Sequence, residues 1–254
     1  MKKVAVIVPF ALDEVDLARR RAQTEGVSLS ADIEYDFVPV KAGPSSFQSP
    51  HDWLLLDVAV LEAGLDAEDR GYRAVVVDSA SDSGVDALRS VLDIPVVGPG
   101  RASMLFALTL GKRFGVLAQW EPALARLEKS LTEWGLRKHC AGVEHFDTEP
   151  DFEKLIGDKS EAVIPKMEEA CGRLIELGAD VICLGSTTMH EAHRVLAERL
   201  PVPIINPGPL SYKLVEVLLA TGLSHSRRAY PKPLVPKPEM IHAMLDSAAG
   251  RPSG

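Results

Sequence analysis

Ser79 and Ser186 each stand where a short apolar run gives way to small hydroxyl residues and then to a helical pattern. The two stretches read "VVVDSASDSG" at residues 75–84 and "VICLGSTTMH" at residues 181–190. A helix that begins directly after a strand offers unpaired backbone N–H groups and the positive end of its dipole, where small carboxylates bind. We therefore interpret Ser79 and Ser186 as candidate catalytic residues on opposite sides of one bound anion.

The residues that follow the two serines supply further polar groups. Ala80 and Ser81 follow the first serine, and Thr187 and Thr188 follow the second, so their N–H groups and hydroxyls are candidate substrate contacts. A single hydroxyl in this position is as often a plain helix N-cap, so the functional interpretation depends on the pair.

Ionisable side chains near the serines matter because a serine hydroxyl acts as a base only when a neighbour takes its proton. Asp78 precedes the first serine, and His190 follows the second by about one helical turn. Both are candidate members of a proton relay. Asp82 is expected to cap a helix that starts near Ser83. A serine–histidine–aspartate hydrolase is disfavoured because the sequence has no GxSxG motif.

Composition predicts a globular chain with a sizeable core and an acidic surface. The 254 residues are 46% hydrophobic and 25% charged, with a formal net charge of −8. That balance disfavours a nucleic-acid partner, which would require a basic surface. The one dense basic stretch, Arg19–Arg21, is interpreted as a solvated helix face. No apolar run reaches the length of about 18 residues that a membrane span needs.

The three cysteines, Cys140, Cys171 and Cys183, have no CxxC spacing and form an odd set. This pattern indicates free thiols in a reducing compartment, which favours the cytoplasm, and it predicts no metal site. Cys183 stands in the apolar run "VICL" and Cys171 in a helical pattern, so both are interpreted as packing residues.

Short β-branched runs alternate with amphipathic stretches along the whole chain. The predicted strands lie within residues 3–10, 34–40, 73–80, 94–100, 113–119, 140–146, 180–186 and 202–208. The predicted helices include residues 52–63, 121–134, 160–177 and 191–200. Apolar runs without alternation are typical of parallel strands buried on both faces, so the sequence predicts an α/β fold with right-handed crossovers.

The chain also reads as approximately doubled. "DIPVVGPGRASMLFALTLG" and "PVPIINPGPLSYKLVEVLLATG" each read as a strand, a turn with proline and glycine, and an apolar helix closed by glycine. We predict two similar lobes, each a parallel sheet flanked by helices, related by a pseudo-twofold axis with the site in the cleft between them. Residues 1–98 with 208–254 would form the first lobe, and residues 99–207 the second. Either apolar helix could lie between subunits of a homo-oligomer, although burial inside a lobe explains both equally well.

Several stretches of the sequence resemble those of a known protein family. "DSASDSGVDALRSVLDIPVVGPG" and "LGSTTMHEAHRVL" resemble the two signature regions of the aspartate/glutamate/hydantoin racemase superfamily, most closely its hydantoin racemase-like branch. The tail "GLSHSRRAYPKPLVPK" and the stretch "AGPSS" at residues 42–46 resemble that branch as well. The resemblance implies two α/β lobes with the active site between them. It also implies that one cysteine abstracts a proton and a second delivers one, with no metal, flavin or pyridoxal cofactor.

The chain departs from that family pattern at the site itself. Serine stands at both cysteine positions, Ser79 and Ser186, and a serine hydroxyl is a far weaker acid than a thiol with its pKa of about 8.5. Phe10 stands where the family has a polar contact to the carboxylate, and Gln119 and Trp120 stand where it tends to have threonines. These three are candidate substrate contacts in a larger, more apolar pocket with an aromatic wall. Packing explains Phe10 and Trp120 equally well.

Three functional hypotheses follow. The leading one is a cofactor-independent enzyme that acts at the carbon next to a carboxylate or hydantoin-like carbonyl, on a small carboxylate or cyclic ureide. Racemisation, isomerisation, decarboxylation, elimination and hydrolysis stay open, because one fold supports several chemistries. The second is a small-carboxylate-binding or regulatory homologue that has lost the acid–base pair. The third, a nucleotide-binding protein, is weak because no predicted strand is followed by GxGxxG or a P-loop.

Overall fold

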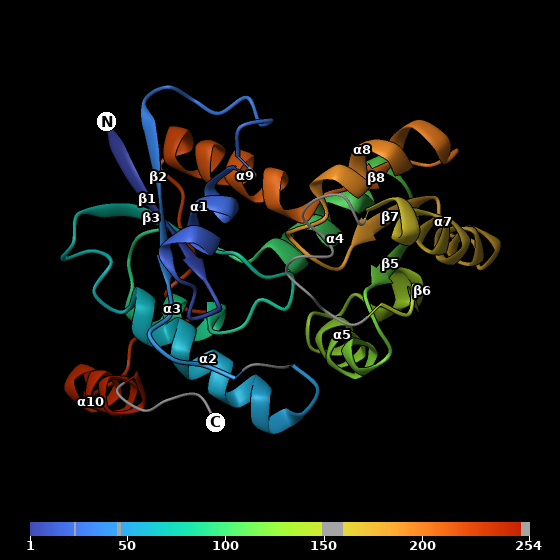
Figure 1. Cartoon of the computed structure of the whole chain (residues 1–254). Helices are drawn as coiled ribbons and strands as arrows, with labels where there is room; N and C mark the ends of the chain where they lie inside the picture. The colour runs from blue at the N-terminus through green and yellow to red at the C-terminus, as the bar shows by residue number, and fades with distance from the viewer. Residues whose placement is uncertain (23, 45–46, 149–159, 250–254) are drawn as a thin grey trace. The chain divides into compact units, whose positions relative to one another are not determined.

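A computed structural model of the chain describes residues 1–22, 24–44, 47–148 and 160–249, so part of the "AGPSS" stretch lies outside the described residues. The chain divides into two compact units (Figure 1). Unit 1 comprises Met1–Gly98 and Ser211–Gly254, and unit 2 comprises Pro99–Leu210. Each unit is built around its own sheet and is described by itself.

Unit 1 is a parallel sheet with helices on both faces. Its strands are β1 (Lys2–Val8), β2 (Ile33–Pro39), β3 (Tyr72–Val77) and β4 (Val96–Val97), in the order β2-β1-β3-β4. One face packs against α2 (Pro50–Gly64), α3 (Val85–Val91) and α10 (Pro238–Ala249). The other face packs against α1 (Glu14–Ala22) and the C-terminal part of α9 (Pro207–Thr221).

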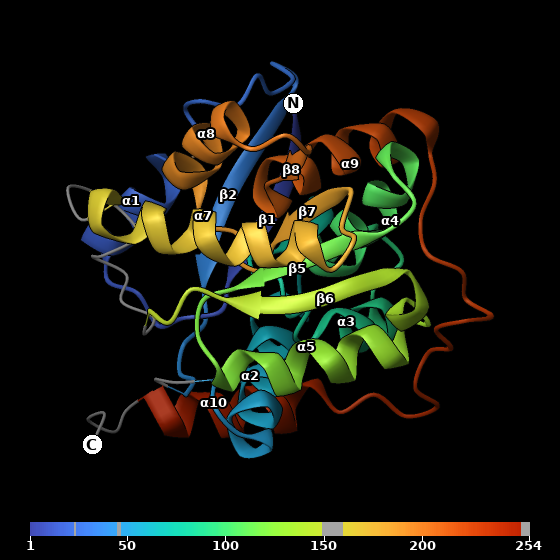
Figure 2. The ribbon, with the colours of Figure 1, turned by 90° about the vertical axis from the view of Figure 1, so that its right-hand side faces the viewer.

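Unit 2 repeats this plan. Its strands are β5 (Phe114–Ala118), β6 (Cys140–His145), β7 (Val181–Leu184) and β8 (Ile204–Ile205), in the order β6-β5-β7-β8. The helices α7 (Ser160–Glu176) and α8 (His190–Arg199) cover one face (Figure 2). The other face packs against α4 (Pro99–Leu110) and α5 (Pro122–Glu133), and a 3₁₀ turn, η1 (Arg137–His139), leads into β6. The prediction of two similar parallel sheets, each flanked by helices, is confirmed.

The shared strand order fixes where a ligand site is expected in each unit. The chain runs from the first strand outward to one side and then returns to continue on the other side, so the order reverses between β1 and β3 and again between β5 and β7. Open parallel sheets bind ligands outside the carboxyl ends of the strands at such a switch point. Ile7 pairs with Val77, and Leu117 with Leu184, so the segments that leave these strands start side by side.

The basic stretch Arg19–Arg21 differs from its predicted form. Arg19 and Arg21 are exposed, but Arg20 is buried together with Leu17 on the inner face of α1. Residues three positions apart share one helix face, and the two neighbours of Arg20 point elsewhere. The interpretation of all three arginines as a solvated face was therefore wrong for Arg20.

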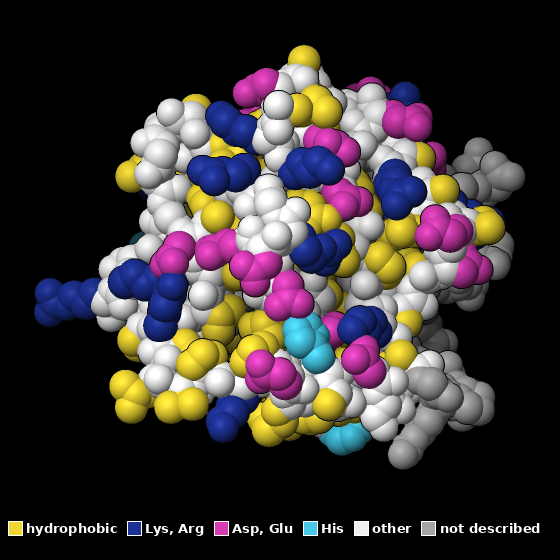
Figure 3. Space-filling model, turned by 90° about the vertical axis from the view of Figure 1, so that its left-hand side faces the viewer, with side chains coloured by type: hydrophobic (Ala, Val, Ile, Leu, Met, Phe, Trp, Pro, Cys, Tyr) yellow, Lys and Arg dark blue, Asp and Glu magenta, His cyan; other side chains and the backbone are white. Residues whose placement is uncertain are grey.

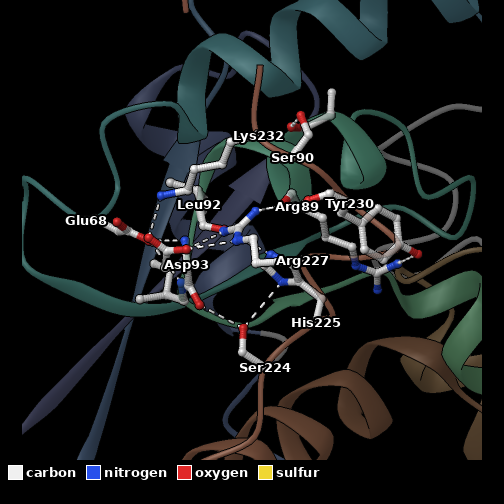
Figure 4. Close-up of polar contacts among 12 residues, drawn as sticks. Glu68, Arg89, Ser90, Leu92, Asp93, Ser224, His225, Arg227, Tyr230 and Lys232 are labelled. Atoms are coloured by element: carbon white, nitrogen blue, oxygen red, sulfur yellow. Dashed lines mark hydrogen bonds and ion pairs between the residues drawn. The ribbon is translucent and has the colours of Figure 1, made fainter. Parts of the chain in front are cut away.

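The segment between α9 and α10 is tied to the α3–β4 turn by charged groups (Figure 4). Asp93 contacts Arg227 Nε at 2.8 Å and Lys232 Nζ at 2.6 Å, and the hydrogen bond to Lys232 is the main reason that its pKa is lowered. Arg89 of α3 donates to the Tyr230 hydroxyl at 3.1 Å and also to a carbonyl of β4. This C-terminal segment is therefore held to α3 and to the turn that follows it.

The helices and one face of unit 1 can be described in terms of apolar and charged surface. None of the helices within the described ranges is long and apolar enough to cross a bilayer. On the face of unit 1 drawn in Figure 3, acidic and basic side chains are both present. Several apolar side chains of α4 and α9 remain exposed, among them Leu105, Leu110 and Val217.

Candidate active site

The Ser79 loop, residues 78–84, joins β3 to α3 at the switch point of unit 1. Ser79 Oγ lies 2.8 Å from Ser81 Oγ and accepts a longer bond, 3.3 Å, from the Ser81 amide. Ser81 Oγ lies in turn 2.9 Å from Ser83 Oγ. Ser79 is half-buried and Ser83 is buried, so a row of three hydroxyls runs from a partly accessible position into the protein.

The Ser186 loop, residues 185–189, joins β7 to α8 at the switch point of unit 2 and has the same local geometry. Ser186 Oγ lies 2.9 Å from Thr188 Oγ1 and accepts a 3.3 Å bond from the Thr188 amide. Ser186 and Thr188 are half-buried, and Thr187 between them is buried. Ala80 between Ser79 and Ser81 is buried in the same way. The structure therefore builds one hydroxyl arrangement twice, at equivalent places in two sheets.

Both loops leave their strands by the same backbone step. The amide of Asp78 donates to Ile7 O at 2.8 Å, and the amide of Gly185 donates to Leu117 O at 2.8 Å. Each bond joins the residue before the serine to the central strand of its sheet. The side of the loop that carries the serine is thus fixed by the sheet rather than by the helix that follows.

The start of α3 differs from its predicted form. The helix begins at Val85, its N-cap is Gly84 with φ 71°, and no side chain caps it, so Asp82 is not the cap. A side chain at Gly84 would lie 2.8 Å from Val60 of α2, so both the positive φ and the close approach require glycine. Asp82 instead adopts the left-handed conformation (φ 52°), and its carboxylate lies against Gly98 after β4.

The residue before each serine distinguishes the two loops. Asp78 carries a buried carboxylate whose Oδ2 lies 3.1 Å from Nε of the buried Arg20. At the equivalent position of unit 2, a side chain on Gly185 would lie 2.8 Å from Leu117 O and 3.4 Å from Ala118 Cα. One loop is therefore held by an ion pair, and the other is held against a strand that leaves no room for a side chain.

The predicted substrate contacts after the central strands also lie at the switch points. Phe10 follows β1, and its half-buried ring packs against Phe47 with centroids 5.1 Å apart. Gln119 and Trp120 follow β5 and are half-buried. Gln119 O accepts the Thr148 amide at 3.0 Å, while Gln119 Nε2 is buried and has no acceptor among the residues that the structure describes.

His190 is the first residue of α8, directly after the Ser186 loop. Its Nδ1 lies 3.3 Å from Nδ2 of the buried Asn206, and its Nε2 would lie 3.6 Å from a side chain placed on Gly208. His190 is thereby held over the β8–α9 turn. His193, which the sequence also places on this helix, bonds to Ile204 O at 3.1 Å and so serves to pin α8 to β8.

All three cysteines are buried, which confirms the packing role predicted for Cys171 and Cys183 and adds Cys140 to them. Burial raises the pKa of Cys140 to about 11 and that of Cys171 to about 12. The pKa of the fully enclosed Cys183 is raised further, again by burial. Thiols with such pKa values stay protonated at neutral pH, so none of them supplies the thiolate that the signature positions lack.

The two described serine loops contain neither a metal-binding cluster nor the pocket of unit 1. No group of three or more histidine, cysteine, aspartate or glutamate side chains within the described ranges is arranged to hold a metal ion. A pocket of about 350 Å³ lies in unit 1 and is lined by residues that include Glu62, Asp66 and His242. Neither serine loop lines this pocket.

The structure adds three groups that sequence reasoning missed. Ser83 extends the hydroxyl row, Arg20 pairs with Asp78, and Asn206 holds His190. The alternation "SASDS" indicated the row, since residues two apart in a loop can share one side. Nothing in the sequence separates Arg20 from its two exposed neighbours except its place on the apolar stripe with Leu17.

Comparison with known proteins gives a consistent result. The family model described as Asp/Glu/Hydantoin racemase matches residues 18–215. A hydantoin racemase of Pseudomonas sp. (strain NS671) is 30% identical over 217 residues, which cover 81% of this chain and 84% of that protein. A hydantoin racemase of Rhizobium meliloti is 27% identical over 192 residues, or 74% of this chain and 79% of that protein.

A solved structure agrees with these sequence matches. Allantoin racemase from Klebsiella pneumoniae superposes with a TM-score of 0.82 at 27% identity, covering 93% of this chain and 95% of its own. The family match spans both serine loops and most of both units. The chain therefore belongs to the Asp/Glu/hydantoin racemase family, on its hydantoin racemase-like branch.

Proposed function

We propose that this protein is a cofactor-independent racemase of cyclic ureides, five-membered rings of the hydantoin type, and that Ser79 and Ser186 face one bound substrate. The observation that carries the proposal is the repeated hydroxyl geometry: Ser79 with Ser81, and Ser186 with Thr188, at equivalent switch points of two sheets in a racemase-family chain. Relatives named hydantoin racemase and allantoin racemase support this substrate class.

Racemisation at such a site needs a proton acceptor on one face of the substrate carbon and a proton donor on the other. A carbon between two electron-withdrawing groups of a ureide ring loses its proton more readily than the α-carbon of an amino acid. A carboxylate or an imidazole, each a weaker base than a thiolate, therefore suffices when a serine hydroxyl relays the proton to it. We propose that Ser79 Oγ takes the proton from one face while Ser186 Oγ gives its own proton to the opposite face, and that the roles reverse for the other enantiomer.

Each serine needs a neighbour that exchanges protons with it. In unit 1, the row from Ser79 through Ser81 to Ser83 provides a path along which each hydroxyl passes its proton to the next. We propose Asp82, whose carboxylate belongs to the same loop, as the group that receives and returns this proton. In unit 2, Thr188 bonds to Ser186, and we propose His190, at the start of the helix that follows, as the group that exchanges protons with them.

The residues after the central strands would form the rest of the pocket. Phe10 and Trp120 supply aromatic surface for the ring or its substituent, and Gln119 supplies an amide whose Nε2 has no acceptor among the described residues. The backbone amides near Ala80 and Thr187 are proposed to bind the carbonyl oxygen that becomes negative when the proton leaves. The three free thiols fit an enzyme of a reducing compartment.

The test is loss of optical rotation from single enantiomers of 5-substituted hydantoins and of allantoin, corrected for spontaneous racemisation in buffer. Ser79→Ala and Ser186→Ala should each lower the catalysed rate on the order of 10²–10⁴-fold, because each removes one proton-transfer group. Ser90→Ala is the matched control, because Ser90 lies on α3 and its hydroxyl donates to Ala87 O of the same helix.

Two results separate the proposed enzyme from a homologue that only binds. Thermal shift with each ureide reports binding, since a ligand that prefers the folded state raises its stability. Binding without any rate above the buffer blank would show a non-catalytic homologue and overturn the racemase proposal. Ser79→Cys/Ser186→Cys would then show whether only the two thiols were missing.

A further inference from the structure

Arg20 is a buried cation at the root of the Ser79 loop. It lies on the inner face of α1, and its side chain is 3% exposed. Its Nε lies 3.1 Å from Asp78 Oδ2, and the Asp78 side chain is 4% exposed. The ion pair therefore ties α1 to the residue that directly precedes Ser79, out of contact with water.

This guanidinium is incompletely satisfied. A guanidinium has five N–H donors, yet Nε and Nη1 of Arg20 have no hydrogen-bond acceptor among the residues that the structure describes. The 3.1 Å contact to Asp78 has ion-pair distance without hydrogen-bond alignment. The guanidinium also lies near the Phe10 ring, whose centroid is 6.0 Å from Arg20 Cζ. Buried polar groups with so few partners are rare in native proteins and call for an explanation.

The Arg20–Asp78 pair lies at the turn that leads into Ser79. The amide of Ser79 donates to Val77 O at 2.8 Å, which makes a tight turn centred on Asp78. The side chain of Asp78 thus fixes the turn from the buried side, and Ser79 follows at once. Tyr212 of α9 faces the same pair: burial, followed by the charge of Asp78, raises its pKa.

Stability alone does not account for such a pair. Replacing a buried ion pair with apolar groups of similar volume is often neutral or stabilising, because removing two charges from water is costly. Unit 2 supports this view, since the equivalent residue there is Gly185, whose amide makes the same bond to the central strand without any charged side chain. The pair in unit 1 must therefore be explained by what it positions.

We propose that Arg20 is a positioning residue for Ser79: through Asp78 it holds the turn that aims the Ser79 hydroxyl and the row behind it. This inference rests on the proposed function for its kinetic readout, but the positioning itself is measurable without turnover. A misplacement of a reacting group by about 1 Å is enough to cost on the order of 10²-fold in rate while leaving binding nearly intact.

The experiment compares the wild type with Arg20→Met/Asp78→Asn, which removes both charges and leaves neither buried alone. We expect the double variant to fold, with kcat lowered on the order of 10–100-fold and KM changed less than about threefold. Hydrogen exchange at the Ser81 amide, which bonds to Ser79 Oγ, should become faster. Arg199→Met/Glu168→Gln removes an exposed pair, 2.8 Å apart between α8 and α7, and should change neither measurement.

Arg20→Lys keeps the test decisive if the double variant does not fold. Lysine retains the charge but not the planar fork, so kcat should fall by about two- to tenfold and should exceed that of the double variant where both can be measured. Unchanged kcat and unchanged exchange at Ser81 in the folded variants would overturn the positioning role. If the wild type itself has no racemase activity, the proposed function fails, and the exchange rate at Ser81 still decides the role of Arg20.

Discussion

The Ser79 loop and the Ser186 loop have the same hydroxyl geometry and opposite means of support. Each places a serine two residues beyond a central parallel strand and bonds it to a hydroxyl two residues on. In unit 1 the turn is anchored by a buried charge on Asp78. In unit 2 the turn rests on Gly185, where no side chain fits.

This difference shows that the sheet sets where each turn leaves its strand, whereas the side chains that support the turn differ between the two units. Equal hydrogen bonds from Asp78 to Ile7 and from Gly185 to Leu117 fix both turns. The supporting contacts differ, with an arginine–aspartate pair in unit 1 and a histidine–asparagine contact in unit 2. A two-sided site with unlike supports would have unlike sensitivities to mutation and to pH.

The largest effect is expected from Gly185→Ala. The added methyl group would lie 2.8 Å from Leu117 O, a backbone atom that cannot move without distorting β5. Overpacking of this kind typically destabilises a protein by about 1–3 kcal/mol, and the displaced Ser186 loop should lose most racemase activity. Urea denaturation and the optical-rotation assay measure the two effects.

Gly172→Ala is the control for that variant. Gly172 lies within α7, nothing lies within 4 Å of its added methyl group, and no positive φ is recorded there. Alanine should therefore stabilise the helix by about 0.4–1 kcal/mol and leave activity unchanged. Full activity in Gly185→Ala would mean that the two loops do not depend on their different supports.

A smaller, pH-dependent effect is expected for α10 of unit 1. His242 contacts Glu62 through Nδ1 at 2.7 Å and Asp66 through Nε2 at 3.0 Å, and these hydrogen bonds, with that to Glu62 the larger, raise its pKa. Lys41 Nζ bridges Glu62 at 2.8 Å and Asp246 at 2.6 Å in the same cluster. Two carboxylates on one imidazole require its protonated form.

The sign of the effect follows from the raised pKa. The contribution of His242 is complete below the unfolded-state pKa of about 6.5 and is lost as pH rises through the higher folded-state pKa. Amide exchange in α10, corrected for its intrinsic pH dependence, should therefore accelerate in that range. His242→Gln should remove the dependence, and amides of α4 in unit 2, which contains no histidine, should show none. Equal pH dependence in α4 and α10 would refute the assignment to His242.

The sequence predicts the fold well because its signals are local. Unbroken β-branched runs such as those of β3 and β7 specify buried parallel strands, and all eight predicted strands are present. The approximate repeat likewise predicts two similar sheets, which the common strand order confirms. The two serines were identifiable because small hydroxyl residues at the end of an apolar run are unusual for packing.

The supporting groups were less predictable because they depend on contacts distant in sequence. Arg20 and Asp78 meet only once α1 packs on the sheet, and the local pattern of three arginines favours solvent. The start of α3 was misplaced because Gly84, with positive φ, begins the helix in place of the expected Asp82 cap. The roles of Phe10, Gln119 and Trp120 stay predictions, since no residue contact described here tests them.

The central claim, that Ser79 and Ser186 serve opposite faces of one carbon, is tested most directly by hydrogen exchange from each enantiomer of a ureide in heavy water. Wild-type protein should exchange the ring α-hydrogen of both enantiomers. Each single serine-to-alanine variant should exchange the hydrogen of one enantiomer only, and the configuration of that enantiomer should not change. The two variants should act on opposite enantiomers. Loss of exchange from the same enantiomer in both variants would contradict the account.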